Sequence, residues 1–399
     1  MSPVNTQNIN KEFIQENPYI NHIDDEIDSA VFTELGRLLR EATLRAETAT
    51  VEEEPVIEEA TLLPFNMERV VDSAVHLLGS KQDIVHTVHR LLEDREEWDL
   101  AVMDGHGSTK GTNPYTGKYE TYNLTLLTIQ EMIENGKLDD ILALDIYAEE
   151  DTAVVFQKLL SQKCLEVKQG MTQVGATFSL IQIRRDFITK KITVNILTVG
   201  DSPVTIHCNG EKVLESAEHS WINKDEMERL RREKRIDRHE ISPSNNFKLL
   251  NEETIVAEPS GYVNVGPCQL AMTQSLGHIQ YSYGKIIDEK GLFGLAPFKA
   301  TMIFDETDEL NIKGYSDGVS DVVVEYLPQD VEFLKAANAT ETAELAKSRW
   351  EKTWDAVAKT VYDRAIAEGI TLVDIPKSKF SFGKTADDVC CVSWIQTRR

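Results

Sequence analysis

Residues Val102-Met103-Asp104-Gly105-His106-Gly107 end an apolar run that begins at Asp99, and this stretch decides how the rest of the chain is interpreted. The run has the composition of a buried strand, so Asp-Gly-His-Gly would stand at the tip of that strand. A carboxylate and an imidazole held together at a strand tip are typical of metal-assisted hydrolysis. Asp104 and His106 are therefore the first candidate site residues.

Four other short acidic segments occupy similar positions at the ends of expected strands. Their aspartates are Asp83, Asp201, Asp317 and the adjacent pair Asp387 and Asp388. Taken singly, Asp-Gly and Gly-Asp pairs are weak evidence, because turns favour both residue types. If the strands converge, however, several carboxylates meet and repel one another unless cations are bound. Oxygen ligands of this kind suit Mg²⁺ or Mn²⁺ better than zinc.

The composition sets outer limits on the function. With 399 residues, of which 41% are hydrophobic, the chain fits one large domain with extensions. Its formal charge of −25, from 42 basic and 67 acidic residues, argues against binding to nucleic acids or anionic membranes, which favour basic surfaces. An acidic chain can instead hold divalent cations. Nothing in the sequence indicates an oligomeric state.

Cysteines and apolar runs indicate the compartment. The five cysteines are odd in number, scattered and without CxxC spacing, so neither a disulfide framework nor a zinc site is expected. No apolar run reaches the roughly 18 residues that span a bilayer, and no N-terminal stretch has the signal-peptide pattern. These features predict an intracellular, cytoplasmic protein, with the nucleus as an alternative.

Residues 1–62 differ in composition from the rest of the chain. They hold four basic against fourteen acidic residues, which is typical of a tail or linker. Within them, residues 30–46 carry a rough helical stripe of apolar side chains that would dock on the main domain or on a partner. A solvated acidic extension, partly helical or disordered, is the simpler expectation, with one catalytic domain over residues 63–399.

From residue 63 onward, hydrophobic periodicity predicts strands and helices in separate blocks. Residues 125–135 repeat apolar side chains in steps of three and four and stop at Gly136, as a helix with a glycine terminator does. Runs rich in β-branched residues predict an antiparallel meander of three strands, 176–183, 191–199 and 204–208. Further strands are expected at 300–304, 309–315 and 389–395, with helices between 334 and 366. Such blocks predict an α+β fold built on packed antiparallel sheets.

Six short motifs follow one another between residues 75 and 396. They are Asp104-Gly105-His106-Gly107, Gly175-Ala176-Thr177-Phe178, Gly200-Asp201-Ser202, Leu270-Ala271-Met272-Thr273-Gln274-Ser275-Leu276-Gly277, Tyr315-Ser316-Asp317-Gly318-Val319-Ser320-Asp321 and Asp387-Asp388-Val389-Cys390-Cys391-Val392. In this order the chain resembles the metal-dependent serine/threonine protein phosphatases of type 2C, and six ordered matches are hard to obtain by chance. The resemblance implies two packed antiparallel β-sheets sandwiched between α-helices, with a two-metal centre at one end of the sandwich.

The same resemblance assigns metal-binding roles to four residues of these motifs. Asp104 would bridge two ions, either Mg²⁺ or Mn²⁺. The carbonyl oxygen of Gly105 would bind the second ion. Asp317 and Asp387 would complete the first ion site.

The remaining roles complete the reaction that the resemblance implies. Asp201 and Asp321 match the ligands of a third, weaker metal site, and Asp83 matches the aspartate that supports water near the second ion. Two ions about 3.5 to 4 Å apart lower the pKa of a bridging water, so a hydroxide would attack phosphorus without a covalent intermediate. His106 matches the general acid that protonates the leaving alcohol. The implied substrates are phosphorylated proteins.

Two departures from the family pattern concern the grip on phosphate. Leu78 replaces the arginine five residues before Asp83, and Gln82 replaces the acidic residue just before it. Glutamine occurs there in some members of the family, but a bidentate arginine grip is not simply replaced. Lys81 is a candidate substitute as a point charge, and an arginine from elsewhere is another.

A basic run offers one source of positive charge. Residues 228–238 contain six basic side chains in an otherwise acidic chain, in the stretch that the resemblance places beside the active site. Arg231 and Arg232 are candidates for steering phosphorylated substrates. A solvated helix or a nuclear-import signal would explain the run equally simply. Gln274 and His278 also stand where the family usually has arginine and aspartate.

Two other classes of function stay open on this evidence. The replacements at Leu78, Gln82 and Gln274 favour a pseudophosphatase that keeps the fold and binds phosphoproteins or a regulatory partner without turnover. A metal-binding structural module, in which His106 is incidental, is the third possibility. The complete set of first-site ligands favours the active enzyme, because a scaffold has no need of them.

Overall fold

The computed structural model describes residues 67–79, 81–168, 174–221, 223–233, 241–243, 263–265, 268–286, 294–324, 328–352 and 386–398. The expected extension over residues 1–62 and its helix lie outside these ranges, as do Lys234, Arg235 and Arg238 of the basic run. The part of the chain that is described contains no helix long and apolar enough to cross a membrane.

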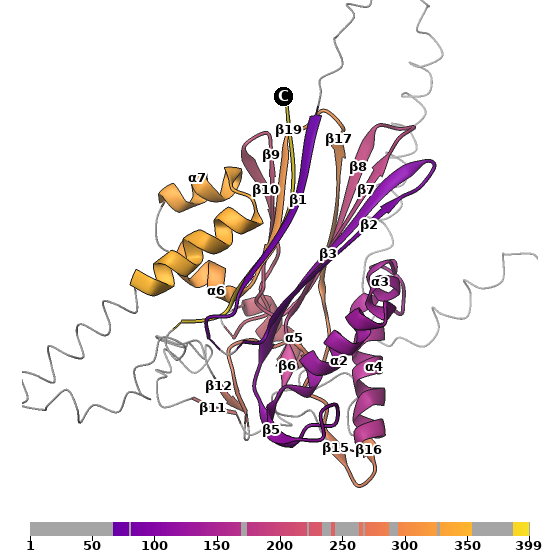
Figure 1. The fold of residues 1–399 in the computed structure, drawn as a ribbon, viewed down its shortest axis with the longest axis vertical. Coiled ribbons are helices and arrows are strands. Elements are labelled where there is room, and N and C mark those ends of the chain that lie inside the picture. The colour runs from indigo at the N-terminus through magenta and orange to yellow at the C-terminus, as the bar shows by residue number, and fades with distance from the viewer. Residues whose placement is uncertain are drawn as a thin grey trace, which may run out of the picture. The chain divides into compact units, whose positions relative to one another are not determined.

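Two antiparallel sheets form the body of the protein (Figure 1). The smaller sheet has the strand order β1 (Met67–His76), β19 (Val389–Arg398), β18 (Leu310–Tyr315), β9 (Val204–Cys208) and β10 (Glu211–Glu215). The larger sheet has the order β14 (Leu276–Gly277), β6 (Gly175–Ala176), β3 (Arg95–His106), β7 (Phe178–Asp186), β8 (Lys191–Val199) and β17 (Phe298–Asp305), with β2 (Asp83–Leu91) also paired to β3. Short strands make three minor sheets: β4 (Thr109–Thr112), β5 (Tyr119–Tyr122), β11 (Ile241–Pro243), β12 (Val263–Val265), β13 (Cys268–Leu270), β15 (Tyr281–Ser282) and β16 (Lys285–Ile286).

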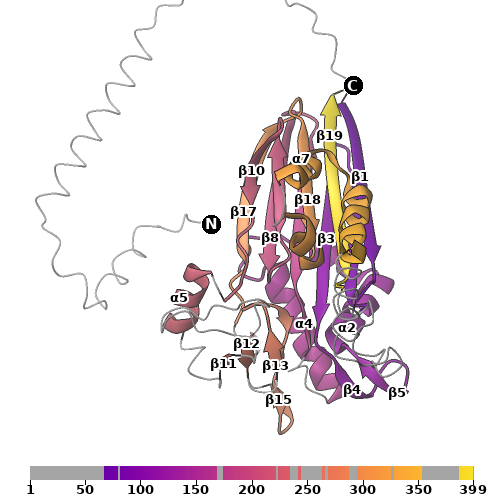
Figure 2. The ribbon, with the colours of Figure 1, turned by 90° about the vertical axis from the view of Figure 1, so that its left-hand side faces the viewer.

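Helices cover the outer faces of the two sheets (Figure 2). The larger sheet is covered by α2 (Leu124–Glu134), α3 (Lys137–Leu142) and α4 (Thr152–Val167). The smaller sheet is covered by α7 (Pro328–Ala336) and the helical residues 339–352. Three short elements complete the set: α5 (Lys224–Arg232), α6 (Asp317–Val319) and the π-helical turn η2 (Ser320–Val324). The predicted α+β fold of packed antiparallel sheets between helices is confirmed.

Strand β3 explains why polar and apolar residues do not alternate in the run before Asp104. Leu100 and Val102 face the apolar layer between the two sheets. Ala101 and Met103 point the other way, into the layer under α2 and α4. Because both faces of the strand are covered, every residue from 98 to 103 is buried, as expected for a central strand covered on both sides.

Strand β18 alternates between apolar and polar side chains, and both kinds are buried. Leu310 and Ile312 face the layer between the sheets. Asn311 and Lys313 point outward to the C-terminal end of α7, where Asn311 Nδ2 donates to the carbonyl of Lys335 at 2.7 Å and Lys313 Nζ donates to that of Leu334. A buried cation at a helix C-terminus satisfies carbonyl groups that the helix itself leaves unpaired.

The local predictions hold in most places and fail in one. The predicted helix over residues 125–135 is α2, which begins after the N-cap Asn123 and ends just before Asn135 and Gly136. The predicted three-stranded meander is wrong at its third strand. Strands β7 and β8 pair in the larger sheet, whereas β9 pairs with β18 and β10 in the smaller one. The turn 200–203 thus crosses between the sheets, which short apolar runs of similar composition do not reveal.

Candidate active site

Five aspartates come together where strands begin or end, at the end of the sandwich away from the last residues of β19 (Figure 1). Asp104 lies near the end of β3, and Asp83, which opens β2, is its direct partner across the ladder. Asp317 follows β18 and Asp387 precedes β19, and these two strands are antiparallel neighbours. Asp201 follows β8. The fold therefore brings together carboxylates that are far apart in sequence.

The backbone of Asp104 is held by the threonine of the second motif. Thr177 N donates to the carbonyl of Asp104 at 2.8 Å, and Asp104 N donates to Thr177 Oγ1 at 3.2 Å. Thr177 Oγ1 is also 2.6 Å from Ser202 Oγ. Three of the motifs found in the sequence are thus joined by hydrogen bonds, and Asp104 is fixed from both sides.

Asp388 anchors the loop that carries Gln82 and Asp83. It is 1% exposed, and its carboxylate accepts hydrogen bonds from Gly79 N at 2.6 Å and Gln82 N at 2.7 Å. Sequence reasoning gave Asp388 no role, although its position beside Asp387 at the start of a strand meant that the two side chains would point in different directions. Its function is to position the loop.

The turn that carries Asp317 is packed too closely for any residue but glycine at position 318. A Cβ atom on Gly318 would lie 1.9 Å from the carbonyl oxygen of Asp388. The indole of Trp350 donates to the carbonyl of Gly318 at 2.8 Å, so residues 339–352 also hold this turn. The π-helical turn that follows contains Asp321, and such turns are frequent at functional sites.

A cavity of about 210 Å³ opens between these elements. It is lined by Gln82, Asp104, Gly105, His106, Gly107, Leu270, Ala271, Met272, Asp317 and Asp387. Five of the predicted site residues therefore share one cavity. Asp83, Asp201 and Asp321 are not in the lining, but the charge of Asp321 raises the pKa of both Asp201 and Asp317, and that of Asp83 raises the pKa of Asp104.

Burial and like charge raise the pKa values of this carboxylate cluster. The pKa of Asp104 lies well above its usual range because of burial first, and then because of the charges of Asp83 and Asp317. The pKa of Asp317 is raised in the same way, by burial and then by Asp387 and Asp201. Burial is also the main reason why the pKa values of Asp83 and Asp201 rise to about 7. None of the main causes of these shifts is a lysine or an arginine.

Several carboxylate oxygens in the cluster are buried without a hydrogen-bond partner. They are both oxygens of Asp83, Oδ1 of Asp201 and Oδ1 of Asp317. Among the described residues, no three His, Cys, Asp or Glu side chains are already arranged around one point as metal ligands are, as expected where like charges repel. Unpaired buried oxygens are costly, and hard divalent cations would satisfy them. The residues present therefore fit Mg²⁺ or Mn²⁺.

His106 is paired with a second histidine that sequence reasoning mentioned only as a departure. Its Nε2 lies 2.7 Å from Nε2 of His278, and the two rings are stacked with centroids 5.0 Å apart. Its Nδ1 is buried without a hydrogen-bond partner. Desolvation, and then the charge of His278, lower the pKa of His106 well below its usual value. The protein alone therefore favours a neutral His106.

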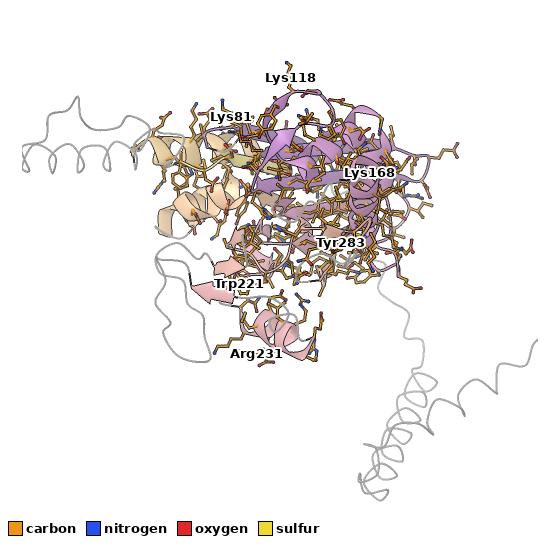
Figure 3. All side chains as sticks on the ribbon, turned by 90° about the horizontal axis from the view of Figure 1, so that it is seen from below. Lys81, Lys118, Lys168, Trp221, Arg231 and Tyr283 are labelled. Carbon is orange, nitrogen blue, oxygen red and sulfur yellow. The ribbon has the colours of Figure 1, made fainter. Side chains whose placement is uncertain are left out.

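Neither the position of the missing arginine nor its candidate substitutes contribute a charge to the cavity lining. Leu78 packs against the apolar cluster around Tyr315. Lys81 is exposed, has a left-handed backbone with φ of 63°, and is outside the cavity lining. Arg231 and Arg232 are exposed on α5. Seen from below, Lys81 and Arg231 lie on opposite sides of the molecule (Figure 3).

Helix α5 is nevertheless tied to the wall of the cavity. Glu226 of this helix accepts hydrogen bonds from Thr273 Oγ1 at 2.8 Å and Gln274 Nε2 at 3.0 Å, directly after the lining residues 270–272. Arg229 is buried and paired with Glu226 at 2.7 Å. One residue of the basic run, Arg229, is thus buried, and Gln274 binds α5 to the cavity wall through Glu226.

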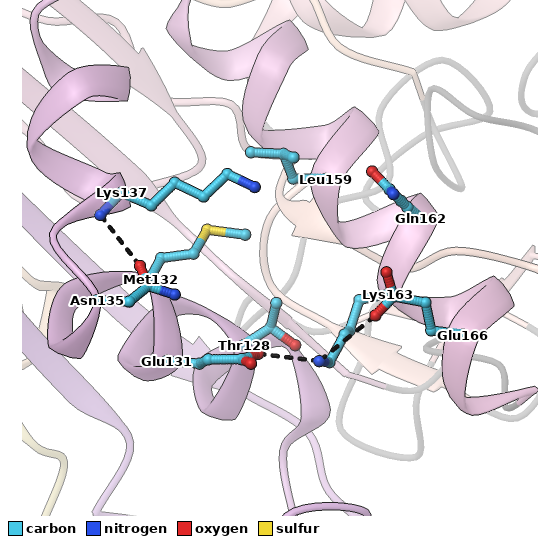
Figure 4. Close-up of a pocket in the computed structure, with 9 residues that line it drawn as sticks. All are labelled: Thr128, Glu131, Met132, Asn135, Lys137, Leu159, Gln162, Lys163 and Glu166. Carbon is cyan, nitrogen blue, oxygen red and sulfur yellow. Dashed lines mark hydrogen bonds and ion pairs between the residues drawn. The ribbon is translucent and has the colours of Figure 1, made fainter.

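A second hollow, of about 170 Å³, lies between α2 and α4 (Figure 4). Three of its charges are paired with one another, because Lys163 Nζ is 2.9 Å from the carboxylate of Glu131 and 3.5 Å from that of Glu166. It contains none of the predicted site residues. Of these two hollows, the first holds clustered carboxylates, one of which, Asp317, has a buried oxygen without a hydrogen-bond partner.

Comparison with known proteins gives structural matches only. No protein-family model and no curated sequence matches the chain. Among solved structures, a serine/threonine phosphatase of S. agalactiae is 14% identical, with 82% of this chain and 99% of that chain covered and a TM-score of 0.38. A sex determining protein of C. elegans is 16% identical, with 96% and 76% covered and a TM-score of 0.39.

A third solved structure that matches the chain also belongs to a phosphatase. It is the type 2C phosphatase domain, with a fragment of the regulatory domain, of the cell fate determinant SpoIIE from Bacillus subtilis. The identity is 12%, the match covers 84% of this chain and 65% of that chain, and the TM-score is 0.36. These matches have identities of 12 to 16% and TM-scores of 0.36 to 0.39, so the function of the chain is argued from its own site.

Proposed function

We propose that the protein is a metal-dependent phosphoprotein phosphatase that hydrolyses phosphoserine or phosphothreonine esters with Mg²⁺ or Mn²⁺. The observation that carries this proposal is the cavity in which Asp104, Asp317 and Asp387 meet His106. The buried carboxylate oxygens without partners support it, since they are ready to bind cations. The buried cysteines Cys390 and Cys391 form no disulfide and accord with a cytoplasmic location.

In the proposed reaction, the chain's own residues bind and orient. Asp104, Asp317 and Asp387 would hold two ions, with Asp201 and Asp321 near a weaker third position. Ions bound there would lower the pKa of water and neutralise phosphate oxygens. The apolar wall from Leu270 to Met272 would exclude bulk water from the reacting group and so strengthen the electrostatic interactions inside the cavity.

His106 is proposed as the proton donor to the leaving alcohol. It lines the cavity two residues from Asp104. A phosphate ester held by cations at the carboxylates would therefore lie beside its ring. A bound phosphate is an anion, and a neighbouring anion raises the pKa of an imidazole. Substrate binding would therefore supply the protonated form that the protein alone disfavours. The contact with His278 would keep the ring in one orientation.

Arg231 and Arg232 are proposed to attract phosphorylated substrates without touching the reacting phosphate. They project from α5, which is fastened to the cavity wall through Glu226. Long-range attraction of this kind accelerates encounter and weakens as salt increases. Changing both arginines to alanine should raise KM for a phosphopeptide more than for a small aryl phosphate. Equal effects on the two substrates would contradict steering.

One observation favours the alternative of a catalytically impaired pseudophosphatase. Among the described residues, no arginine or lysine lines the cavity, and the position of the expected arginine is filled by Leu78, which packs on an apolar cluster. Without a guanidinium to grip phosphate, the site would bind phosphoproteins or a regulatory partner and turn them over slowly or not at all.

Turnover in the presence and absence of metal separates the two proposals. Hydrolysis of a phosphothreonine peptide and of p-nitrophenyl phosphate would be measured with Mn²⁺, Mg²⁺ or EDTA. The wild type would be compared with Asp317→Ala and with Asp305→Ala, an exposed aspartate paired with Lys191, as the matched control. The enzyme proposal expects EDTA and Asp317→Ala to abolish turnover while Asp305→Ala keeps it. No turnover by folded wild type with either metal would instead support the pseudophosphatase.

A further inference from the structure

Gln82 lies directly against the segment that carries the candidate second metal position. Its carbonyl accepts a hydrogen bond from Gly105 N at 3.2 Å, and its side chain lines the cavity. A Cβ atom on Gly105 would lie 2.7 Å from that carbonyl oxygen, so the two backbones are in close contact. The side chain of Gln82 therefore starts beside Gly105 and lines the same cavity as Gly105 and Gly107.

The end of the Gln82 side chain faces two carbonyl oxygens. One of its two terminal atoms is 3.3 Å from the oxygen of Gly105 and 3.0 Å from that of Gly107. An amide oxygen at this point would face two other oxygens, whereas an amide nitrogen would donate one hydrogen to each. The orientation of an amide is assigned from such neighbours, and these two favour the nitrogen.

The neighbouring Asn123 is compatible with that orientation. Its Oδ1 accepts a hydrogen bond from Leu126 N at 3.2 Å as the N-cap of α2, so its amide cannot turn round. Its Nδ2 is 2.9 Å from the same atom of Gln82, which is a hydrogen bond if that atom is the amide oxygen. With the nitrogen there, the two hydrogens of Nδ2 still have the carbonyls of His106 at 3.1 Å and Gly175 at 3.0 Å as acceptors, and two carbonyl contacts outweigh one lost hydrogen bond. In this arrangement the two amide hydrogens of Gln82 donate to the carbonyls of Gly105 and Gly107, and the two of Asn123 donate to the carbonyls of His106 and Gly175.

We propose that Gln82 holds the carbonyl of Gly105 in a hydrogen bond and thereby makes the second metal position much weaker than the first. This inference rests on the proposed metal centre. A cation at Gly105 needs the lone pairs of the carbonyl oxygen, while an amide hydrogen there carries partial positive charge and competes for them. The first position uses Asp317 and Asp387, whose segments do not depend on this bond.

Replacing Gln82 by glutamate should reverse this preference. The two side chains have almost the same shape, but a carboxylate has no hydrogen to donate and adds a negative charge beside two carbonyl oxygens. A cation relieves that repulsion. Gln82→Glu should therefore gain a second tightly bound ion. Gln82→Met, which removes the donor without adding charge, should tighten the second ion by about threefold, because no amide hydrogen then competes for the carbonyl oxygen of Gly105.

The experiment counts Mn²⁺ ions bound per full-length chain by equilibrium dialysis, so no turnover is needed. Wild type should bind one ion tightly and a second at least about tenfold more weakly, which corresponds to 1.4 kcal/mol. Gln82→Glu should bind two with similar affinity. Lys81→Ala, an exposed neighbour outside the cavity lining, should behave as wild type, and Asp317→Asn should lose the tight ion. Circular dichroism would check that each variant is folded.

The possible results separate this inference from the proposed metal centre. Two ions of equal affinity in wild type would overturn the inference and leave the metal centre in place. So would a second ion that Gln82→Met does not tighten, because Gln82→Glu alone could act through its added charge. No bound ion in wild type would overturn the metal centre and the inference together.

Discussion

Asp99 and Asp104 belong to the same strand and are both buried, yet the protein treats their charges in opposite ways. Asp99 is 0% exposed and accepts hydrogen bonds from Arg90 and, at 2.7 Å, from Arg184. Burial raises its pKa, and the two arginines oppose that shift. Asp104 is 9% exposed and faces Asp83 and other carboxylates, all of which add to the effect of burial.

The difference shows which buried charge serves the fold and which serves binding. At Asp99 the chain supplies its own cations, so the ion pairs are complete within the protein. At Asp104 the chain supplies more anions, and the unpaired oxygens nearby remain to be satisfied from outside. Unsatisfied buried charge is unfavourable unless a bound cation compensates it. The comparison therefore locates the site without reference to any motif.

The largest expected effect follows from removing the charge of Asp104, the buried aspartate that is proposed to bind cations. Asp104→Asn keeps the size and the backbone bonds to Thr177, but removes the carboxylate that would be shared by the ions. Turnover of a phosphothreonine peptide should fall by roughly 10²- to 10³-fold, the loss expected for one preorganised electrostatic group. Asp305→Asn, an exposed aspartate of β17, should change turnover by less than about twofold, because surface pairs contribute little. Comparable losses in both variants would refute the assignment.

For Asp99, the same comparison predicts a loss of stability and no comparable loss of activity. Asp99→Ala leaves Arg90 and Arg184 without their main partner, with side chains only 25% and 19% exposed. The free energy of unfolding should fall by about 3 kcal/mol, as when one partner of a buried ion pair is removed. Urea unfolding in EDTA and in Mn²⁺ should show the same loss. A loss that appears only with Mn²⁺ would mean that Asp99 belongs to the metal site.

A smaller effect tests a third way of burying charge, at Lys313. Burial lowers the pKa of this amine to about 8, and its Nζ donates to a carbonyl at the end of α7. Since the folded pKa is below the unfolded value, stability is reduced below about pH 8 and recovers as pH rises toward about 10.4.

A methionine at position 313 removes this titration. The free energy of unfolding of wild type, relative to Lys313→Met, should therefore increase between pH 7.5 and pH 9.5. The increase should be about 1 to 2 kcal/mol, because over this pH range the amine loses its proton in the folded state while it stays protonated in the unfolded state. Urea unfolding at three pH values would measure it. A difference that stays constant with pH would show that Lys313 titrates normally.

The general architecture and the ends of the strands could be predicted because they depend on local pattern. The apolar run before Asp104 is continuous because both faces of β3 are buried, and α2 ends just before Gly136 as its periodicity predicted. Asp83, Asp104, Asp201, Asp317 and Asp387 each adjoin an apolar run, so their places at strand ends were visible, whereas Asp321 lies in the π-helical turn η2. The assignment of β9 was not visible, because its composition suits either sheet.

The parts of the site that could not be predicted depend on contacts between distant residues. Asp388 bonds to the loop at Gly79, and His278 meets His106 across 172 positions. Nothing in either segment alone indicates its partner. The expectation that Lys81 would fill in for the missing arginine rested on sequence distance, whereas its side chain lies outside the cavity lining.

Thermal unfolding in EDTA and in Mn²⁺, for wild type and Asp104→Asn, tests most directly whether the uncompensated carboxylates form a cation site. Wild type should unfold at a higher temperature in Mn²⁺ than in EDTA, because an ion bound only to the folded state stabilises it. Asp104→Asn should be at least as stable as wild type in EDTA, since it removes one repelling charge, and should gain little from Mn²⁺. An equal gain in both proteins, or none in wild type, would contradict the account.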